Sequence, residues 1–114
     1  MDIRRADIVL VNLDPVVGSE QGKTRPALVI QNDIGNQNSP TTIVAPITTK
    51  LYSKEYPTNV KVGKNESGLS EDSTILLNQI RTVDRSRIVR KLSSLRGEQM
   101  AKVELAIKAS LGIE

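Results

Sequence analysis

The chain has 114 residues and a net charge of +3, from 16 basic and 13 acidic residues, and it contains neither cysteine nor histidine. Without cysteine there are no disulfides and no thiolate metal sites, and without histidine the commonest general acid–base group and metal ligand is missing. The mild positive charge suits a nucleic-acid partner but does not require one.

The length fits a single domain over residues 1–114, with a modest core built from Val, Ile, Leu and Ala because Phe and Trp are absent. No apolar run reaches the roughly 18 residues that a membrane-spanning helix needs. The charged N-terminus does not resemble a signal peptide. We therefore expect a cytoplasmic protein with no membrane partner.

Short strands separated by turn residues are predicted along most of the chain, because β-branched runs alternate with clusters of Gly, Pro, Asn, Asp and Ser. The expected strands are residues 7–13, 26–31, 42–48, 58–62, 73–82 and 87–92. The intervening segments 18–24, 32–40, 50–57 and 63–72 are predicted loops. Pro46 cannot donate to a sheet ladder, so we expect an edge position or a bulge there.

A helix is predicted from about Glu98, where the apolar spacing changes to a helical period. Gly112 is a typical stop signal. The expected buried stripe is Met100, Val103, Ala106, Ile107 and Leu111. About six strands followed by one helix predict a mainly β, α+β fold, with a small barrel whose surface the helix covers.

Three ordered segments resemble the MazF/PemK family of toxin ribonucleases: DPVVGSEQGKTRPALVIQND at residues 14–33, TTIVAPITT at 41–49 and ILLNQIRTVDRSRI at 75–88. The resemblance implies a small SH3-like barrel of the MazF/CcdB type with a C-terminal helix, working as a homodimer. It also implies the toxin of a type II toxin–antitoxin system. Such a toxin cuts single-stranded mRNA at a short sequence, independently of the ribosome, and is neutralised by a cognate MazE-like antitoxin.

RNA carries its own nucleophile, because the 2′-hydroxyl can attack the adjacent phosphorus and leave a 2′,3′-cyclic phosphate and a 5′-hydroxyl. The protein must align the sugar and neutralise the phosphorane, and an arginine fork suits the second task. The resemblance makes Arg25 the principal catalytic residue, with Thr48 as a hydroxyl donor. Glu20, the only carboxylate of its loop, is predicted to act as a base or to orient Arg25. We expect no metal and no cofactor.

Neutral polar side chains are predicted to read base edges on the single strand. These RNA-binding candidates are Ser19, Gln21, Asn32, Asn78 and Gln79. Asn32 also fits a simple turn with the backbone. Arg81 belongs to a basic cluster with Arg85, Arg87, Arg90 and Lys91, which either follows phosphates or forms a solvated face.

Two other functions remain open at the level of sequence. A toxin on the same barrel could bind a protein, as gyrase-poisoning relatives do, and would not need the Arg25 and Thr48 pair. A non-catalytic RNA-binding barrel would normally stack bases on exposed aromatic residues, and this chain has only Tyr52 and Tyr56.

Overall fold

The computed structural model describes residues 1–114, with no part of the chain omitted. The strands are β1 (Asp7–Asn12), β2 (Thr24–Val29), β3 (Thr41–Thr48), β4 (Asn59–Val62), β5 (Ser73–Leu76), β6 (Arg81–Asp84) and β7 (Ile88–Ser94). The helices are α1 (Asp33–Asn38), α2 (Lys64–Ser67) and α3 (Gly97–Leu111), with 3-10 turns η1 (Leu77–Gln79) and η2 (Arg85–Arg87). None of the three α-helices has both the length and the apolar character of a membrane span.

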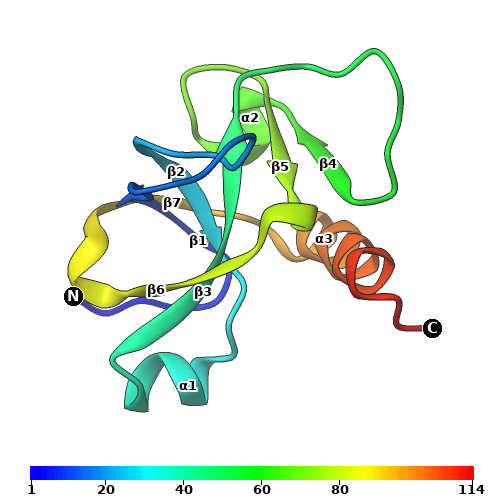
Figure 1. The fold of residues 1–114 in the computed structure, drawn as a ribbon. Coiled ribbons are helices and arrows are strands. Elements are labelled where there is room, and N and C mark those ends of the chain that lie inside the picture. Colours follow the sequence, from blue (N-terminus) through cyan, green and yellow to red (C-terminus); the bar gives the residue numbers. More distant parts are fainter.

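The strands form one antiparallel sheet in the order β4-β5-β3-β2-β1-β7, and β6 also pairs with β3. The central strand β3 has two partners on one side: its first half pairs with β6 and its end pairs with β5. Figure 1 shows the consequence, with β4, β5 and α2 near one end of β3 and β6 and α1 near the other. The predicted barrel-like α+β architecture is confirmed.

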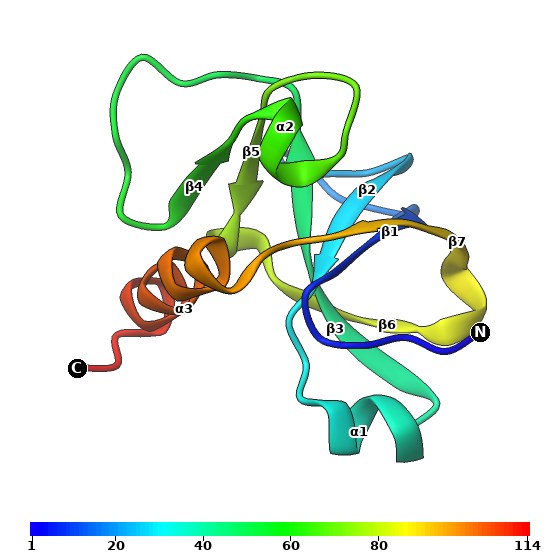
Figure 2. The same ribbon diagram turned by 180° about the vertical axis from the view of Figure 1, so that it is seen from behind.

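Side chains alternate between two apolar clusters, one on each face of β1, β2 and β3. The larger cluster contains Ile8 and Leu28 and extends to α3, whereas the smaller one contains Val9, Ala27 and Val44. α3 packs against η1 and β4, as the reverse view in Figure 2 shows. The alternation matters for the site because every second residue of β2 and β3 shares one face.

The predicted helical stripe is confirmed at its start and wrong at its end. Met100, Val103 and Ala106 are buried, and Ile107 packs beside them. Leu111 is 55% exposed, because the last turn of α3 projects beyond the sheet (Figure 1). Gly112 ends the helix in a left-handed conformation with φ 69°, as its position predicted.

The single strand predicted over residues 73–82 is wrong, since the chain forms β5, then η1, then β6. β5 pairs with Ile47 and Thr48, and β6 pairs with residues 41–44 on the same side of β3. The chain must therefore step past Ala45 and Pro46, and the 3-10 turn makes that step. Pro46 accordingly lies in the central strand where β3 changes neighbours, and not at a sheet edge.

Two predicted loops contain short helices. Residues 33–38 form α1, whose N-terminus is capped by the Asn32 side chain accepting from the Gly35 backbone N–H at 2.8 Å. Residues 64–67 form the single turn α2, whose Glu66 carboxylate accepts from the Gly63 backbone N–H at 2.8 Å. Capping by a polar side chain at the start of a turn is a local signal, and in both segments it outweighed the loop-like composition.

The core makes a direct prediction about stability. Leu28 is fully buried in the larger cluster, so Leu28→Ala is expected to lower the free energy of unfolding by about 2–5 kcal/mol. Leu105→Ala, at a leucine that is 69% exposed, is the control and should change it by less than about 0.5 kcal/mol. Urea unfolding at one protein concentration measures both values, and equal losses would contradict the assigned core.

Candidate functional site

A polar cavity of about 550 Å³ lies between the β1–β2 loop and the segment that joins β5 to β6. Its lining residues are Ser19, Glu20, Gln21, Pro46, Asn78, Gln79, Ile80 and Arg81. Six of the nine residues predicted as site residues from the sequence are in this set. The fold therefore brings together two segments that are about 58 positions apart, as the Gln21–Gln79 contact illustrates.

Arg25 borders this cavity from β2, where its guanidinium is half-buried and held by two acceptors. Its Nε donates to the Gly22 carbonyl oxygen at 2.7 Å, and its Nη1 donates to Oε1 of Gln21, a lining residue. None of the chain's three ion pairs involves Arg25. The guanidinium is thus oriented by neutral groups and keeps an uncompensated positive charge.

Thr48 is the last residue of β3. The ladder between β2 and β3 ends with Ala27 opposite Pro46, and Arg25 and Thr48 each lie two residues beyond that last pair. Pro46 lines the cavity, and Thr48 shares its face of β3 because the two are two residues apart. The Thr48 hydroxyl accepts a hydrogen bond from the Lys50 backbone N–H at 3.2 Å, which fixes it at the end of the strand.

Glu20 lines the cavity but does not contact Arg25. Its carboxylate accepts from the Val17 backbone N–H at 2.7 Å, which closes its own loop. The role of holding Arg25, one of two that the sequence suggested for Glu20, belongs in the structure to Gln21. Gln79 in turn accepts from the Gln21 backbone N–H at 2.8 Å. Sequence reasoning identified both glutamines only as RNA contacts, because no local pattern reveals an interaction across the fold.

Most of the predicted basic cluster is engaged within the chain. Arg81 donates to the Leu13 carbonyl at 2.8 Å and Arg87 to the carbonyls of Asn12 and Asp14, so both hold the root of the β1–β2 loop. Further along, Arg85 donates to the carbonyls of Asn36 and Met1, and Lys91 pairs with the buried Asp7 at 3.1 Å. These contacts do not form one continuous phosphate track, and Arg81 alone of the five lines the cavity.

Asn32 is not brought to the cavity. It precedes α1, which connects to the first residue of β3, whereas Thr48 is the last residue of that strand. Eight strand residues span about 23 Å, so Asn32 and Thr48 lie toward opposite ends of β3. With its side-chain oxygen capping α1, Asn32 has the turn role that its sequence context also allowed.

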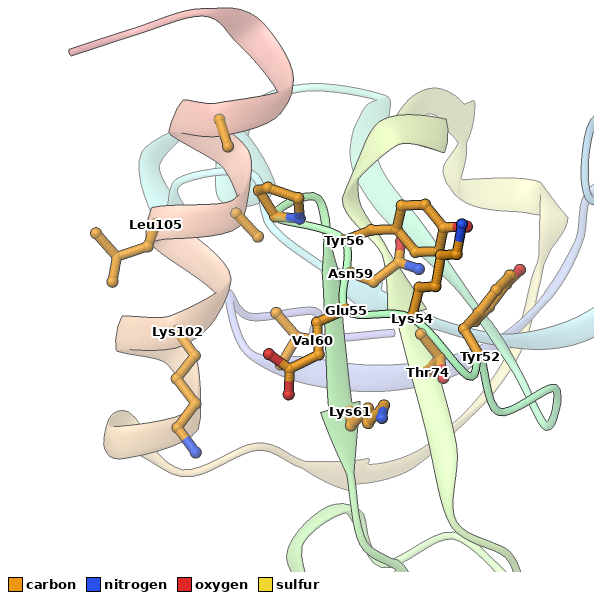
Figure 3. Close-up of a pocket in the computed structure, with 13 residues that line it drawn as sticks. Tyr52, Lys54, Glu55, Tyr56, Asn59, Val60, Lys61, Thr74, Lys102 and Leu105 are labelled. Atoms are coloured by element: carbon orange, nitrogen blue, oxygen red, sulfur yellow. The ribbon is translucent and has the colours of Figure 1, made fainter.

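A second, larger cavity of about 620 Å³ lies between the β3–β4 loop and α3, and Figure 3 shows its side chains. The ring centroids of Tyr52 and Tyr56 are 5.9 Å apart in an edge-to-face arrangement, and the Lys50 ammonium lies 4.8 Å from the Tyr52 centroid. Its lining includes Lys102 and Leu105 of α3 but none of the nine predicted site residues. Size alone therefore does not identify the candidate site.

The two carboxyls with shifted acidity also lie outside the polar cavity. The Arg5 backbone N–H and the Asn36 side chain lower the pKa of Asp33, and hydrogen bonds from Ser86 lower that of Asp84, from a usual value of 3.8. A carboxyl whose pKa is lower in the folded protein than in the unfolded chain stabilises the fold at pH values above its unfolded-state pKa. That stabilisation is lost as the pH falls through the folded-state pKa. Both residues therefore affect stability in acid, and neither lines the polar cavity.

A family model described as PemK-like, MazF-like toxin of type II toxin–antitoxin system matches residues 4–111. The chain belongs to the PemK/MazF toxin family. Among curated relatives, endoribonuclease EndoA of Bacillus subtilis (strain 168) is 49% identical over 113 residues, which cover 99% of this chain and 97% of EndoA.

Solved structures agree with this membership. A crystal structure of MazF from Deinococcus radiodurans matches with a TM-score of 0.84 and 27% identity, covering 99% of each chain. A MazE–MazF crystal structure from the same organism matches with a TM-score of 0.78 and 26% identity over the full length of both chains. This member of the PemK/MazF toxin family therefore has the MazF fold, and the polar cavity lies between its MazF-like segments 14–33 and 75–88.

Proposed function

We propose that this toxin-family chain is a sequence-specific, ribosome-independent endoribonuclease that cuts single-stranded mRNA without a metal or other cofactor. One observation carries the proposal: Arg25, which takes part in no ion pair, and the Thr48 hydroxyl each lie two residues beyond the last β2–β3 pair, whose Pro46 lines a polar cavity. Similarity to EndoA over nearly both full lengths supports it. The rival protein-binding function does not need this pair of side chains.

The proposed reaction uses the nucleophile of the RNA. The 2′-oxygen bonds to phosphorus and the bond from phosphorus to the 5′-oxygen breaks. The departing 5′-oxygen takes a proton from water, and the products are a 2′,3′-cyclic phosphate and a 5′-hydroxyl. Arg25 binds the non-bridging oxygens, whose charge grows in the phosphorane, and Thr48 donates its hydroxyl hydrogen to the same group. Glu20 is the only carboxylate that lines the cavity, and we assign it the proton of the 2′-hydroxyl.

The cavity favours base edges that carry hydrogen-bond acceptors. The carbonyl oxygens of Gln21 and Gln79 already accept from N–H groups, so their NH₂ groups are the ends left for RNA. Ser19 and Asn78 add donor–acceptor groups, and Arg81 adds positive charge. Single-stranded bases expose the edges that such groups read.

The assembly follows the family. We propose that residues 1–114 form one domain, that two copies form a homodimer in the cytoplasm, and that a MazE-like antitoxin neutralises the toxin. The MazE–MazF structures of Deinococcus radiodurans support the class of partner, since they match this chain over its full length.

The test is cleavage of a long single-stranded RNA by the purified protein in excess EDTA. Discrete cuts are expected, and the new 5′ ends should accept phosphate from polynucleotide kinase without prior phosphatase treatment. Because the proposed catalytic groups are all side chains and no metal ion takes part, EDTA should not change the cleavage rate. Cuts that vanish in EDTA and return with Mg²⁺ would contradict the metal-free reaction, and a complete lack of cleavage would contradict the function itself.

A further inference from the structure

Two lining residues of the polar cavity, Gln79 and Gln21, are linked to Arg25 by successive hydrogen bonds. Gln79 accepts from the Gln21 backbone N–H through Oε1 at 2.8 Å, and Gln21 accepts from Arg25 Nη1 through its own Oε1. The Gly22 carbonyl, in the next peptide along, accepts from Arg25 Nε at 2.7 Å. A contact from η1 therefore helps to hold the stretch of loop that supplies both acceptors of the guanidinium.

The chemistry of the donors sets the orientation of both amides. An arginine Nη and a backbone N–H can only donate, so each glutamine must present its carbonyl oxygen to them. Gln79 belongs to a 3-10 turn packed against α3 and β3, whereas Gln21 belongs to a loop without regular structure. The more rigid element therefore holds the less rigid one, as an accurate site requires.

The acceptors around Arg25 are an amide and a peptide carbonyl, and both are neutral. A carboxylate in the same place would hold the guanidinium as firmly, but it would compete with phosphate for the positive charge. Neutral acceptors fix the direction of the fork and leave its charge for an anionic ligand. This combination is what a residue that stabilises a phosphorane needs.

We infer that Gln79 is a positioning residue for Arg25, acting through Gln21, in addition to any contact it makes with RNA. The inference rests on the proposed ribonuclease function. A guanidinium released from this relay would sample other rotamers, and the reacting phosphate would meet it in the productive geometry less often. The relay therefore acts on the rate of the chemical step more than on the binding of RNA.

The test compares Gln79→Met with Gln79→Glu in steady-state cleavage of a short RNA substrate. Gln79→Met keeps the side-chain length and removes the acceptor, so kcat should fall about 10- to 100-fold. Gln79→Glu keeps an acceptor for the Gln21 N–H, so kcat should recover most of that loss, while the added negative charge raises KM. If Gln79 only stabilised the fold or only bound RNA, the two variants would not differ in this way, with a low kcat in Gln79→Met and a largely restored kcat but raised KM in Gln79→Glu.

A second measurement needs no activity and separates this inference from the proposed function. In the free protein, ¹⁵N relaxation of the Arg25 Nε–H group should show a more mobile side chain in Gln79→Met than in the wild type or in Gln79→Glu. Equal kcat in the two variants, or an unchanged Arg25 signal, would overturn the relay. Absence of cleavage by the wild type, with the Arg25 signal altered as expected, would overturn the function and leave the relay intact.

Discussion

Arg25→Ala is expected to lower the cleavage rate by at least about 10²–10³-fold, the usual cost of removing one preorganised group that stabilises transition-state charge. Arg25 is half-buried and belongs to neither apolar cluster, so the thermal unfolding midpoint should stay close to that of the wild type. Single-turnover cleavage and thermal unfolding of the same preparation measure the two quantities. Cells should tolerate expression of the Arg25→Ala gene and stop growing on the wild type.

Arg25→Lys is the matched control because it keeps the charge and removes the fork. A lysine ammonium is a point charge and cannot donate to Gly22 and Gln21 while it presents a planar face to phosphate. We expect its rate to lie between those of the wild type and Arg25→Ala. If Arg25→Ala retained full activity, the proposed mechanism would be wrong; a fully active Arg25→Lys would instead show that charge without orientation is sufficient.

The sequence predicted the architecture well because its signals are local. Runs of β-branched residues predicted β1 and β3 nearly to the residue, and the change to a helical period predicted α3 and its end at Gly112. The strand over residues 73–82 was wrong because the same apolar pattern fits one long strand or two short ones. Only the pairing of both halves with the same side of β3 requires the break at η1.

For the candidate site, too, the sequence predicted features with a local signal and missed those that depend on tertiary contacts. The resemblance pointed to Arg25 and Thr48, and each of them lies two residues beyond the last β2–β3 pair, Ala27 and Pro46. The partners of Arg25 were not predictable, because the acceptor that fixes Gln21 comes from Gln79, 58 positions away. For the basic cluster, charge along the sequence left open a phosphate track or a solvated face, and in the structure carbonyl acceptors from distant segments engage most of it.

Glu20 and Gln21 are neighbouring polar residues of one loop, but their side chains have different hydrogen-bond partners. Glu20 accepts from its own loop and leaves Arg25 unpaired, whereas Gln21 holds Arg25 with a neutral oxygen. The Glu20 carboxylate is thus kept apart from the Arg25 guanidinium. An ion pair between them would have stabilised the loop but reduced the charge that Arg25 offers to phosphate.

Gly22→Ala is expected to impair cleavage almost as severely as direct changes to the site. A Cβ at this position would meet Asp14 Oδ1 and Val16 Cγ2, each at 2.6 Å. The Asp14 carboxylate cannot simply swing away, because its Oδ1 accepts from the Lys23 backbone N–H at 2.8 Å. The loop must therefore shift, and with it the Gly22 carbonyl that holds Arg25.

A displacement of about 1 Å at a catalytic group can lower the rate about 10²-fold. The loop shift that makes room for the added Cβ should also lower the free energy of unfolding by about 1–3 kcal/mol. Gly97→Ala is the matched control, because an added Cβ there meets nothing within 4 Å and Gly97 lies at the start of α3. Gly18→Ala is also uncrowded, but its φ of 59° strains the backbone, so it should lose stability with a smaller loss of rate. If Gly22→Ala cleaved as fast as Gly97→Ala, the position of the Gly22 carbonyl would not control Arg25, and the Gln21 contact alone would have to orient the guanidinium.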